Sequence, residues 1–161
     1  MHPRAVILRE KDLPEVEYAA LAKEIMEICK KYDVPCILHN FPDTAGKLGC
    51  TSIHLPLPRL RKYEANDLSS FLTIGTSVHS VEEALEAEKL GASYLTAGHI
   101  YATDCKKGLP PRGPGFLRSV CKSVSIPVYA IGGIKPDEKQ LNKVMECGAA
   151  GGCVMSGMME I

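Results

Sequence analysis

A histidine at the end of an apolar run is the residue in this sequence best suited to chemistry. His99 follows the run YLTAG (94–98) and precedes a basic, proline-rich loop that extends to residue 113. Imidazole titrates near neutral pH, so a positioned histidine can take up a proton and deliver it again. A lone histidine at a strand end is more often a capping or solvated residue. The residue type alone leaves both interpretations open.

A second group of residues has the character of an anion site. Gly132, Gly133, Met155 and Ser156 lie where two late apolar runs end and helices are expected to begin. Backbone N–H groups at such a turn, beside the positive end of a helix, favour phosphate. Gly132 by itself could equally serve only to make a tight turn.

Two basic side chains follow the first apolar run. Arg9 and Lys11 are separated by one residue, and alternate residues of a strand point to the same side. Both would then face a carboxylate or phosphate group of a ligand.

The cysteines do not indicate a metal or a disulfide framework. There are seven, an odd number, and no two have CxxC spacing. We expect the cysteines to serve as small, buried apolar residues in a protein of a reducing compartment. A metal site from Cys36, His39 and His54 is conceivable but lacks ligand spacing. We therefore expect no metal and no cofactor, with His39 and His54 as structural or pocket-wall residues.

Seven short apolar runs are typical of buried strands. They lie at 5–8, 36–38, 52–55, 71–75, 93–98, 128–132 and 151–155. Their apolarity is continuous rather than alternating, which favours a parallel sheet covered on both faces. Helical patterns at 14–32, 80–90 and 136–147 alternate with them. Repeated strand–helix units predict an α/β fold with right-handed crossovers.

The helical segments carry their own start signals. Asp12 is a plausible cap for the first helix, and Ser80 with Glu83 forms a capping-box pattern that places His79 at a helix entry. Pro136 and Asp137 open the third helix. The expected apolar stripe of the first helix consists of Tyr18, Leu21, Ile25, Ile28 and Tyr32.

The position of the glycines distinguishes two α/β architectures. A doubly wound sheet places its glycine-rich loop after the first strand, where this chain has LREKDL. A (β/α)₈ barrel places its phosphate loops after strands seven and eight, as the late Gly-Gly pairs suggest. We therefore predict one TIM-barrel domain over 1–161, with the first βα unit and the last helix absent. The start would then be misplaced or the chain cut, and open strand edges would favour a homodimer.

Composition excludes several partners. Lys plus Arg and Asp plus Glu both number 19, so no general field attracts nucleic acid. No apolar run approaches the roughly 20 residues that span a bilayer. The N-terminus does not resemble a signal peptide. We expect a cytoplasmic protein whose partner is a small molecule, without nucleic acid or membrane.

Five motifs in order resemble the thiamine phosphate synthase superfamily over essentially the whole chain. They are REKDL (9–13), the segment 74–95, GHIYATDCKKG (98–108), IPVYAIGGI (126–134) and VMSG (154–157). The resemblance implies a TIM barrel and a thiazole phosphate as ligand. The resemblance also implies that Ser77 and Lys106 bind the ligand. Arg9 and Lys11 belong to the first of the five family motifs.

The superfamily contains two activities, and the residues distinguish them. The synthase joins a pyrimidine pyrophosphate to a thiazole phosphate, and the resemblance implies Mg²⁺ held by two Asp positions. Asn40 and Arg59 occupy those positions here. An amide and a guanidinium cannot replace hard anionic ligands of Mg²⁺. On this ground we do not expect synthase activity.

The loop 98–108 is similar to that of the sister enzyme, the thiazole tautomerase. That resemblance implies an isomerase that aromatises a thiazole carboxylate phosphate by a metal-independent proton shift. His99 would be its catalytic acid and base. Two alternatives stay open: a thiamine phosphate synthase, or a non-catalytic barrel that binds a thiamine-pathway metabolite or a partner protein.

Overall fold

Two compact units divide the chain inside one of its strands. The computed structural model describes residues 2–64 and 66–156. Unit 1 covers Met1–Gly75 and unit 2 covers Thr76–Ile161. The boundary falls within strand β4 (Thr73–Val78).

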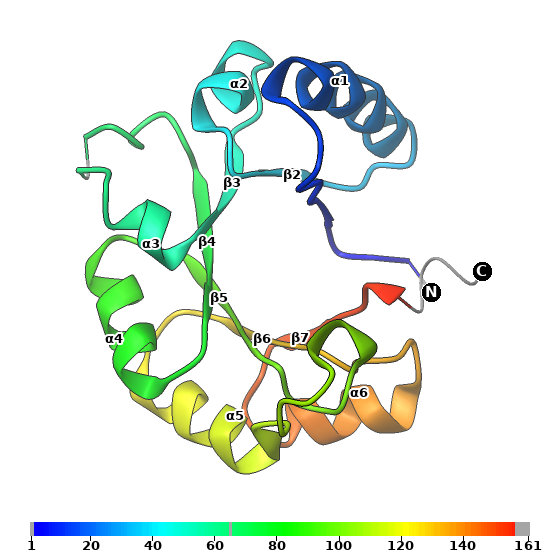
Figure 1. The fold of residues 1–161 in the computed structure, drawn as a ribbon, viewed down its shortest axis with the longest axis vertical. Helices are drawn as coiled ribbons and strands as arrows, with labels where there is room; N and C mark the ends of the chain where they lie inside the picture. The colour runs from blue at the N-terminus through cyan, green and yellow to red at the C-terminus, as the bar shows by residue number, and fades with distance from the viewer. Residues whose placement is uncertain (1, 65, 157–161) are drawn as a thin grey trace. The chain divides into compact units, whose positions relative to one another are not determined.

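Unit 1 is built from parallel strands with helices on one side. Its elements before β4 are β1 (Val6–Leu8), α1 (Glu15–Lys31), β2 (Cys36–His39), α2 (Pro42–Lys47), β3 (Ser52–Pro56) and α3 (Leu57–Leu60). Strand β2 pairs in parallel with β1 and with β3. Helix α1 packs on β1 and β2, and α2 packs on β2 and β3, as Figure 1 shows in blue and cyan. Fully buried apolar side chains such as Leu38, Ile53 and Leu55 fill this unit.

Unit 2 repeats the same strand–helix alternation. Its elements after β4 are α4 (Val81–Lys89), β5 (Tyr94–Gly98), the 3₁₀ turn η1 (Asp104–Lys106), α5 (Gly113–Ser123), β6 (Val128–Ile131), α6 (Glu138–Met145) and β7 (Gly151–Cys153). Strand β6 pairs in parallel with β5 and with β7. Helices α4, α5 and α6 pack against these strands (Figure 1). Leu95, Ala97, Leu117 and Val120 are fully buried in this unit.

The order of the strands settles the architecture. The seven strands are hydrogen-bonded in chain order, β1-β2-β3-β4-β5-β6-β7. A doubly wound sheet would reverse its order at a switch point, whereas a TIM barrel keeps strands sequential. The predicted α/β fold of the barrel type is therefore confirmed, and all seven predicted strands are present.

The first helix buries a different face from the predicted one. Its buried residues are Tyr18, Ala22 and Cys29, while Ile28 and Tyr32 are 53% and 62% exposed. The three buried residues lie within about 40° of one another around the helix, whereas Ile28 lies about 100° from Cys29. Tyr32 is the C-cap residue and follows the last residue of the helix. The predicted Asp12 cap is also wrong, because the helix begins after Pro14 without a side-chain cap.

Other local predictions fared better. Ser80 accepts a hydrogen bond from the backbone N–H of Glu83 over 3.1 Å, and Asp137 caps α6 through Gln140 over 3.0 Å. The strand predicted at 71–75 begins two residues later, at Thr73. Helices α2, α3 and α5 were not predicted individually, although all three carry proline in the first turn.

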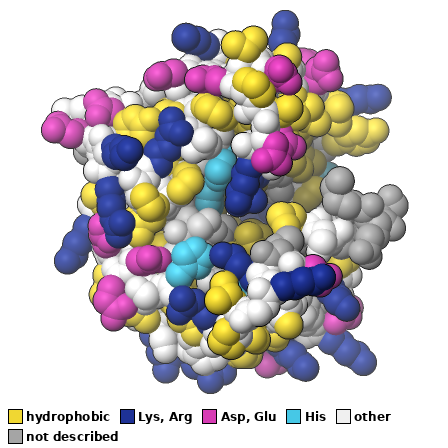
Figure 2. Space-filling view, viewed as in Figure 1, with side chains coloured by type: hydrophobic (Ala, Val, Ile, Leu, Met, Phe, Trp, Pro, Cys, Tyr) yellow, Lys and Arg dark blue, Asp and Glu magenta, His cyan; other side chains and the backbone are white. Residues whose placement is uncertain are grey.

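The surface carries both signs of charge. Basic and acidic side chains are interspersed over the face in Figure 2, in line with the equal totals of 19 each. Within residues 2–64 and 66–156, no helix has the length and apolarity needed to cross a bilayer.

Candidate functional site

The register of unit 1 aligns the carboxyl ends of its first three strands. Leu8 pairs with Leu38, and His39 pairs with His54. Arg9 follows β1, Asn40 follows β2 and Arg59 lies in α3 immediately after β3. Because parallel strands end at the same edge, these polar side chains are brought to one end of the unit.

A buried tyrosine fixes two of these strand ends. The Tyr18 hydroxyl donates to the Leu8 carbonyl oxygen over 2.9 Å and accepts from the His39 backbone N–H over 2.8 Å. The side chain is 0% exposed, and burial raises the pKa of Tyr18 to about 12. Helix α1 therefore ties the ends of β1 and β2 together through a neutral hydroxyl.

Two histidines lie buried at this end. The His39 and His54 rings are stacked, with centroids 5.8 Å apart and planes 18° apart. Burial, then the charges of Arg9, Lys11 and Arg59, lowers the pKa of His39 to about 4. Burial, followed by His39 and Arg9, lowers the pKa of His54 to about 3. Both rings are neutral at pH 7, and His39 Nδ1 lacks a hydrogen-bond partner among the described residues.

Asn40 and Arg59 form a direct pair. Arg59 Nη1 donates to Asn40 Oδ1 over 3.0 Å, and the guanidinium carbon lies 5.8 Å from the centre of the Phe41 ring. Asn40 has φ 73°, a left-handed conformation that asparagine tolerates better than most residues. Its backbone N–H donates to the His54 carbonyl oxygen over 3.1 Å.

This pair does not fit the Mg²⁺ that the family resemblance implies. The amide oxygen of Asn40 is already engaged by a guanidinium, whose charge repels a divalent cation. Mg²⁺ requires oxygen ligands, usually including a carboxylate. Among the described residues, no three His, Cys, Asp or Glu side chains gather in a way that could hold a metal ion.

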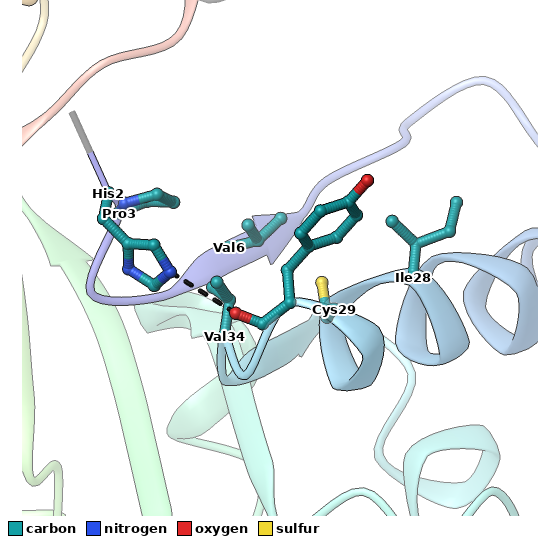
Figure 3. A pocket seen from close by; sticks show the side chains of 7 residues that line it. His2, Pro3, Val6, Ile28, Cys29 and Val34 are labelled. Carbon is teal, nitrogen blue, oxygen red and sulfur yellow. Dashed lines mark hydrogen bonds between the residues drawn. The ribbon is translucent and has the colours of Figure 1, made fainter.

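Two cavities of unit 1 lie elsewhere. One, of about 490 Å³, is lined by His2, Pro3, Val6, Ile28, Cys29, Tyr32 and Val34. Figure 3 shows these side chains around the start of β1, where His2 Nε2 lies 3.3 Å from the Tyr32 carbonyl oxygen. This apolar hollow is at the amino end of the strand, away from Arg9. Ile28 and Tyr32, which lie off the buried face of α1, form part of the wall of this hollow.

In unit 2, polar side chains connect the ends of β4 and β5. The hydroxyls of Ser77 and Thr96 are 2.9 Å apart, and His79 Nδ1 lies 2.7 Å from the Gly98 carbonyl oxygen. The His79 backbone N–H donates to the Glu83 carboxylate over 2.6 Å, as expected for a helix-entry residue. Ser77 thus lies at the carboxyl end of its strand.

His99 is half-buried immediately after β5. Its Nε2 atom lies 3.3 Å from the Leu109 carbonyl oxygen, and its own carbonyl accepts from the Arg112 N–H over 3.0 Å. Both contacts hold the following loop against the end of β5. The predicted catalytic histidine is therefore at the carboxyl end of a strand, with loop backbone as its neighbour.

The glycine pair after β6 has a demonstrable packing role. Gly132 and Gly133 have φ 90° and 68°. A Cβ on Gly132 would overlap His99, and one on Gly133 would overlap Tyr101 and Ala102. The backbone of Tyr101 also donates to the Gly132 carbonyl over 3.0 Å. These glycines let the loop after β5 lie directly on the end of β6.

The other predicted binding residues are exposed. Lys106 ends η1, and Lys107 beside it lies 3.5 Å from the Asp104 carboxylate. Met155 and Ser156 follow β7 and are exposed, and Gly157 lies outside the described residues. The structure places Lys106, Ser156 and the other unit 2 candidates on segments that follow strand ends, except Ser77, which is the penultimate residue of β4.

Comparison with known proteins identifies the family. The family model described as thiamine monophosphate synthase matches residues 2–158. A thiamine-phosphate synthase from Clostridium acetobutylicum is 36% identical over 159 residues, which cover 96% of this chain and 72% of that protein. A thiamine-phosphate synthase from Pyrococcus furiosus is 35% identical over 155 residues, 96% of this chain and 74% of its own length.

A solved structure agrees. The thiamine phosphate pyrophosphorylase from Pyrococcus furiosus superposes with a TM-score of 0.82 at 34% identity, covering 98% of this chain and 75% of that one. The chain therefore belongs to the thiamine monophosphate synthase family. The superfamily predicted from its motifs is confirmed.

The predicted activity is wrong. Relatives that match nearly the whole chain are named synthase, a transferase, rather than tautomerase, an isomerase. The error came from two local features: the short loop around His99 and the loss of two carboxylates. Such a loss removes metal ligands, but it leaves open how another cation could stabilise the same reaction.

Sequence reasoning also missed how the site is held together. Tyr18 was predicted only as part of an apolar stripe, although its hydroxyl links two strand ends. Asn40 and Arg59 were noted only as replaced carboxylates, and their hydrogen bond was not foreseen. Nothing in the spacing of these residues reveals such contacts, because they join separate strand–helix units.

Proposed function

We propose that this chain is a thiamine-phosphate synthase, a transferase that joins a pyrimidine pyrophosphate to a thiazole phosphate. The observation that carries the proposal is the 36% identity to a synthase over 96% of the chain. In this reaction a bond forms between the thiazole phosphate and the pyrimidine moiety, while the bond between the pyrimidine moiety and pyrophosphate breaks and pyrophosphate leaves. We place the reaction in the cytoplasm, as the composition predicts.

The charges of unit 1 are suited to the leaving group. Negative charge accumulates on pyrophosphate as its bond breaks, and prepositioned cations stabilise such charge. Arg9 and Lys11, in the segment after β1, and Arg59, just after β3, supply three positive charges. We assign pyrophosphate binding to Arg9 and Lys11.

The residues of unit 2 are assigned to the second substrate. Backbone N–H groups at Gly133 and Ser156, after β6 and β7, suit the thiazole phosphate. We further assign Ser77 and Lys106 as binding residues for this substrate, together with Gly132 and Met155. His99 becomes a hydrogen-bonding residue of the substrate site, since joining the two substrates calls for no proton shuttle within the thiazole.

A direct assay tests the proposal. The purified chain is incubated with both substrates, in excess MgCl₂ and separately in excess EDTA, and thiamine phosphate and pyrophosphate are quantified. We expect equal molar amounts of the two products, and none when either substrate is omitted. A folded protein that forms no thiamine phosphate under either condition would refute the synthase assignment.

A further inference from the structure

We propose that unit 1 binds the diphosphate group directly, with Arg59, held by Asn40, supplying positive charge where the family resemblance implies a carboxylate-bound Mg²⁺. This inference rests on the proposed synthase function and specifies how its pyrophosphate is held. We call Arg9, Lys11 and Arg59 the cationic edge.

The side chains of the cationic edge are not held in ion pairs among the described residues. Within the described residues, none of its three side chains forms a salt bridge with a carboxylate. The acidic residues adjacent in sequence are Glu10 and Asp12. The Glu10 carboxylate is engaged with its own loop, where it accepts from the backbone N–H groups of Lys11 and Asp12 over 2.9 and 3.4 Å. Three cations without a direct ion pair at one end of a unit attract an anion of several charges.

Arg59 is already oriented for such a ligand. One of its N–H groups is bound by Asn40 Oδ1 at 3.0 Å, and the Phe41 ring lies 5.8 Å from the guanidinium carbon. A guanidinium carries five N–H donors in a planar fork, so donors remain for phosphate oxygens. The Asn40 contact therefore restrains the side chain without exhausting its hydrogen-bonding capacity, which lowers the entropy cost of binding.

A buried histidine offers one more donor at this end. His39 is 8% exposed, and its Nδ1 atom has no hydrogen-bond partner among the described residues. A buried polar atom without a partner is costly, and a ligand that supplies one removes that cost. A phosphate oxygen could accept a hydrogen bond from this ring.

The same arrangement disfavours a metal. An Mg²⁺ at this position would approach a fixed guanidinium and compete with it for the Asn40 oxygen. An asparagine with a left-handed backbone and a paired amide is thus part of the support for Arg59. In this pair the Arg59 guanidinium, which can bind phosphate through two N–H groups, takes the place of a metal ion and its two carboxylate ligands.

Calorimetric titration with inorganic pyrophosphate tests this inference. We expect the native protein to bind pyrophosphate in EDTA at least as tightly as in excess MgCl₂. Arg59→Gln should weaken binding in EDTA by about tenfold or more, as expected on losing a charge-assisted donor. The matched control is Arg4→Gln, the same charge change at an exposed position before β1, and should alter affinity less than about twofold.

The reverse exchange provides a second test. Asn40→Asp combined with Arg59→Asp restores two carboxylates, so pyrophosphate binding should then require Mg²⁺. Binding by the native protein that requires Mg²⁺, or unchanged affinity in folded Arg59→Gln, overturns the inference. Should Arg59→Gln fail to fold, Arg59→Lys keeps the charge but loses the fork, and unchanged affinity in it equally overturns the role of Arg59.

The outcomes separate this inference from the proposed function. Thiamine phosphate formation that EDTA abolishes would leave the synthase assignment intact and refute direct binding. Metal-independent pyrophosphate binding that depends on Arg59, without thiamine phosphate formation, would support the anion site and refute the synthase assignment.

Discussion

Arg59 donates a hydrogen bond over 3.0 Å to Asn40, and the two residues occupy positions where the family resemblance implies metal-binding carboxylates. The contact fixes a guanidinium beside Asn40, at the carboxyl end of β2. Asn40 directly follows His39, whose ring is stacked on that of His54. A fixed positive charge can stabilise a leaving pyrophosphate as a metal does, without the ligands that a metal needs. The replaced carboxylates therefore argue against a metal site and do not argue against transfer chemistry.

Removing the Tyr18 hydroxyl should loosen this end of unit 1. Tyr18→Phe leaves the Leu8 carbonyl and the buried His39 N–H without their partner. We expect a loss of about 1–3 kcal/mol in the free energy of unfolding, measured with urea. Tyr32→Phe, at the exposed tyrosine that caps the opposite end of the same helix, is the control and should change little. Equal effects of the two substitutions would show that the hydroxyl bridge does not stabilise the strand ends.

The buried histidines should make the protein acid-sensitive. Their pKa values are lowered from 6.5 to about 4 for His39 and about 3 for His54, chiefly by burial. Between pH 6.5 and 4 the unfolded chain therefore binds more protons than the folded chain. Stability is fully present above pH 6.5 and declines as the pH falls to 4, by on the order of 3 kcal/mol for each of the two histidines.

Urea unfolding at several pH values between 7 and 4.5 measures this slope. In the double variant His39→Gln, His54→Gln the slope over this range should be flatter, whatever the absolute stability of the variant. A slope identical to that of the native protein would assign the acid sensitivity to other groups.

Gly132 should be far less tolerant of a side chain than a glycine of the same conformation. Gly132 and Gly91 both have φ 90°, but a Cβ on Gly132 overlaps His99 while one on Gly91 meets nothing within 4 Å. Gly91→Ala should cost about 1–2 kcal/mol, the strain of a left-handed residue. Gly132→Ala should cost clearly more, because it also displaces the loop after β5. Similar unfolding free energies for the two variants would contradict the close packing of His99 on Gly132.

The sequence was sufficient for the strand count and order because buried parallel strands are continuous apolar runs. The late position of the glycines distinguished a barrel from a doubly wound sheet. Ser80 and Asp137 marked the starts of two helices, because their capping hydrogen bonds are local and can be predicted from short-range spacing. The face of α1 could not be fixed from the pattern alone, because its apolar residues are spread widely enough that Ile28 and Tyr32 lie off the packed side.

The functional end was less predictable, because it depends on contacts between distant segments. The Tyr18 bridge joins residues 10 and 21 positions apart, and Arg59 reaches Asn40 across 19 positions. Residue type identified Asn40 as an unsuitable metal ligand, yet it could not reveal that its amide holds a cation. A match to one loop motif likewise favoured the wrong reaction, since the motif covers only the segment around His99.

His99 itself provides the last prediction. Its Nε2 atom lies near a backbone carbonyl of the following loop, so in a synthase it contributes hydrogen bonding rather than proton transfer. His99→Asn keeps a polar side chain of comparable size, and thiamine phosphate formation should fall by no more than about tenfold, the effect of one hydrogen bond. The control is His2→Asn, at an exposed histidine beside the apolar hollow of unit 1, which should not alter turnover. Steady-state kinetics with both substrates measures each variant. A loss of 100-fold or more in His99→Asn, in a protein that remains folded, would show that the imidazole takes part in the chemical step after all.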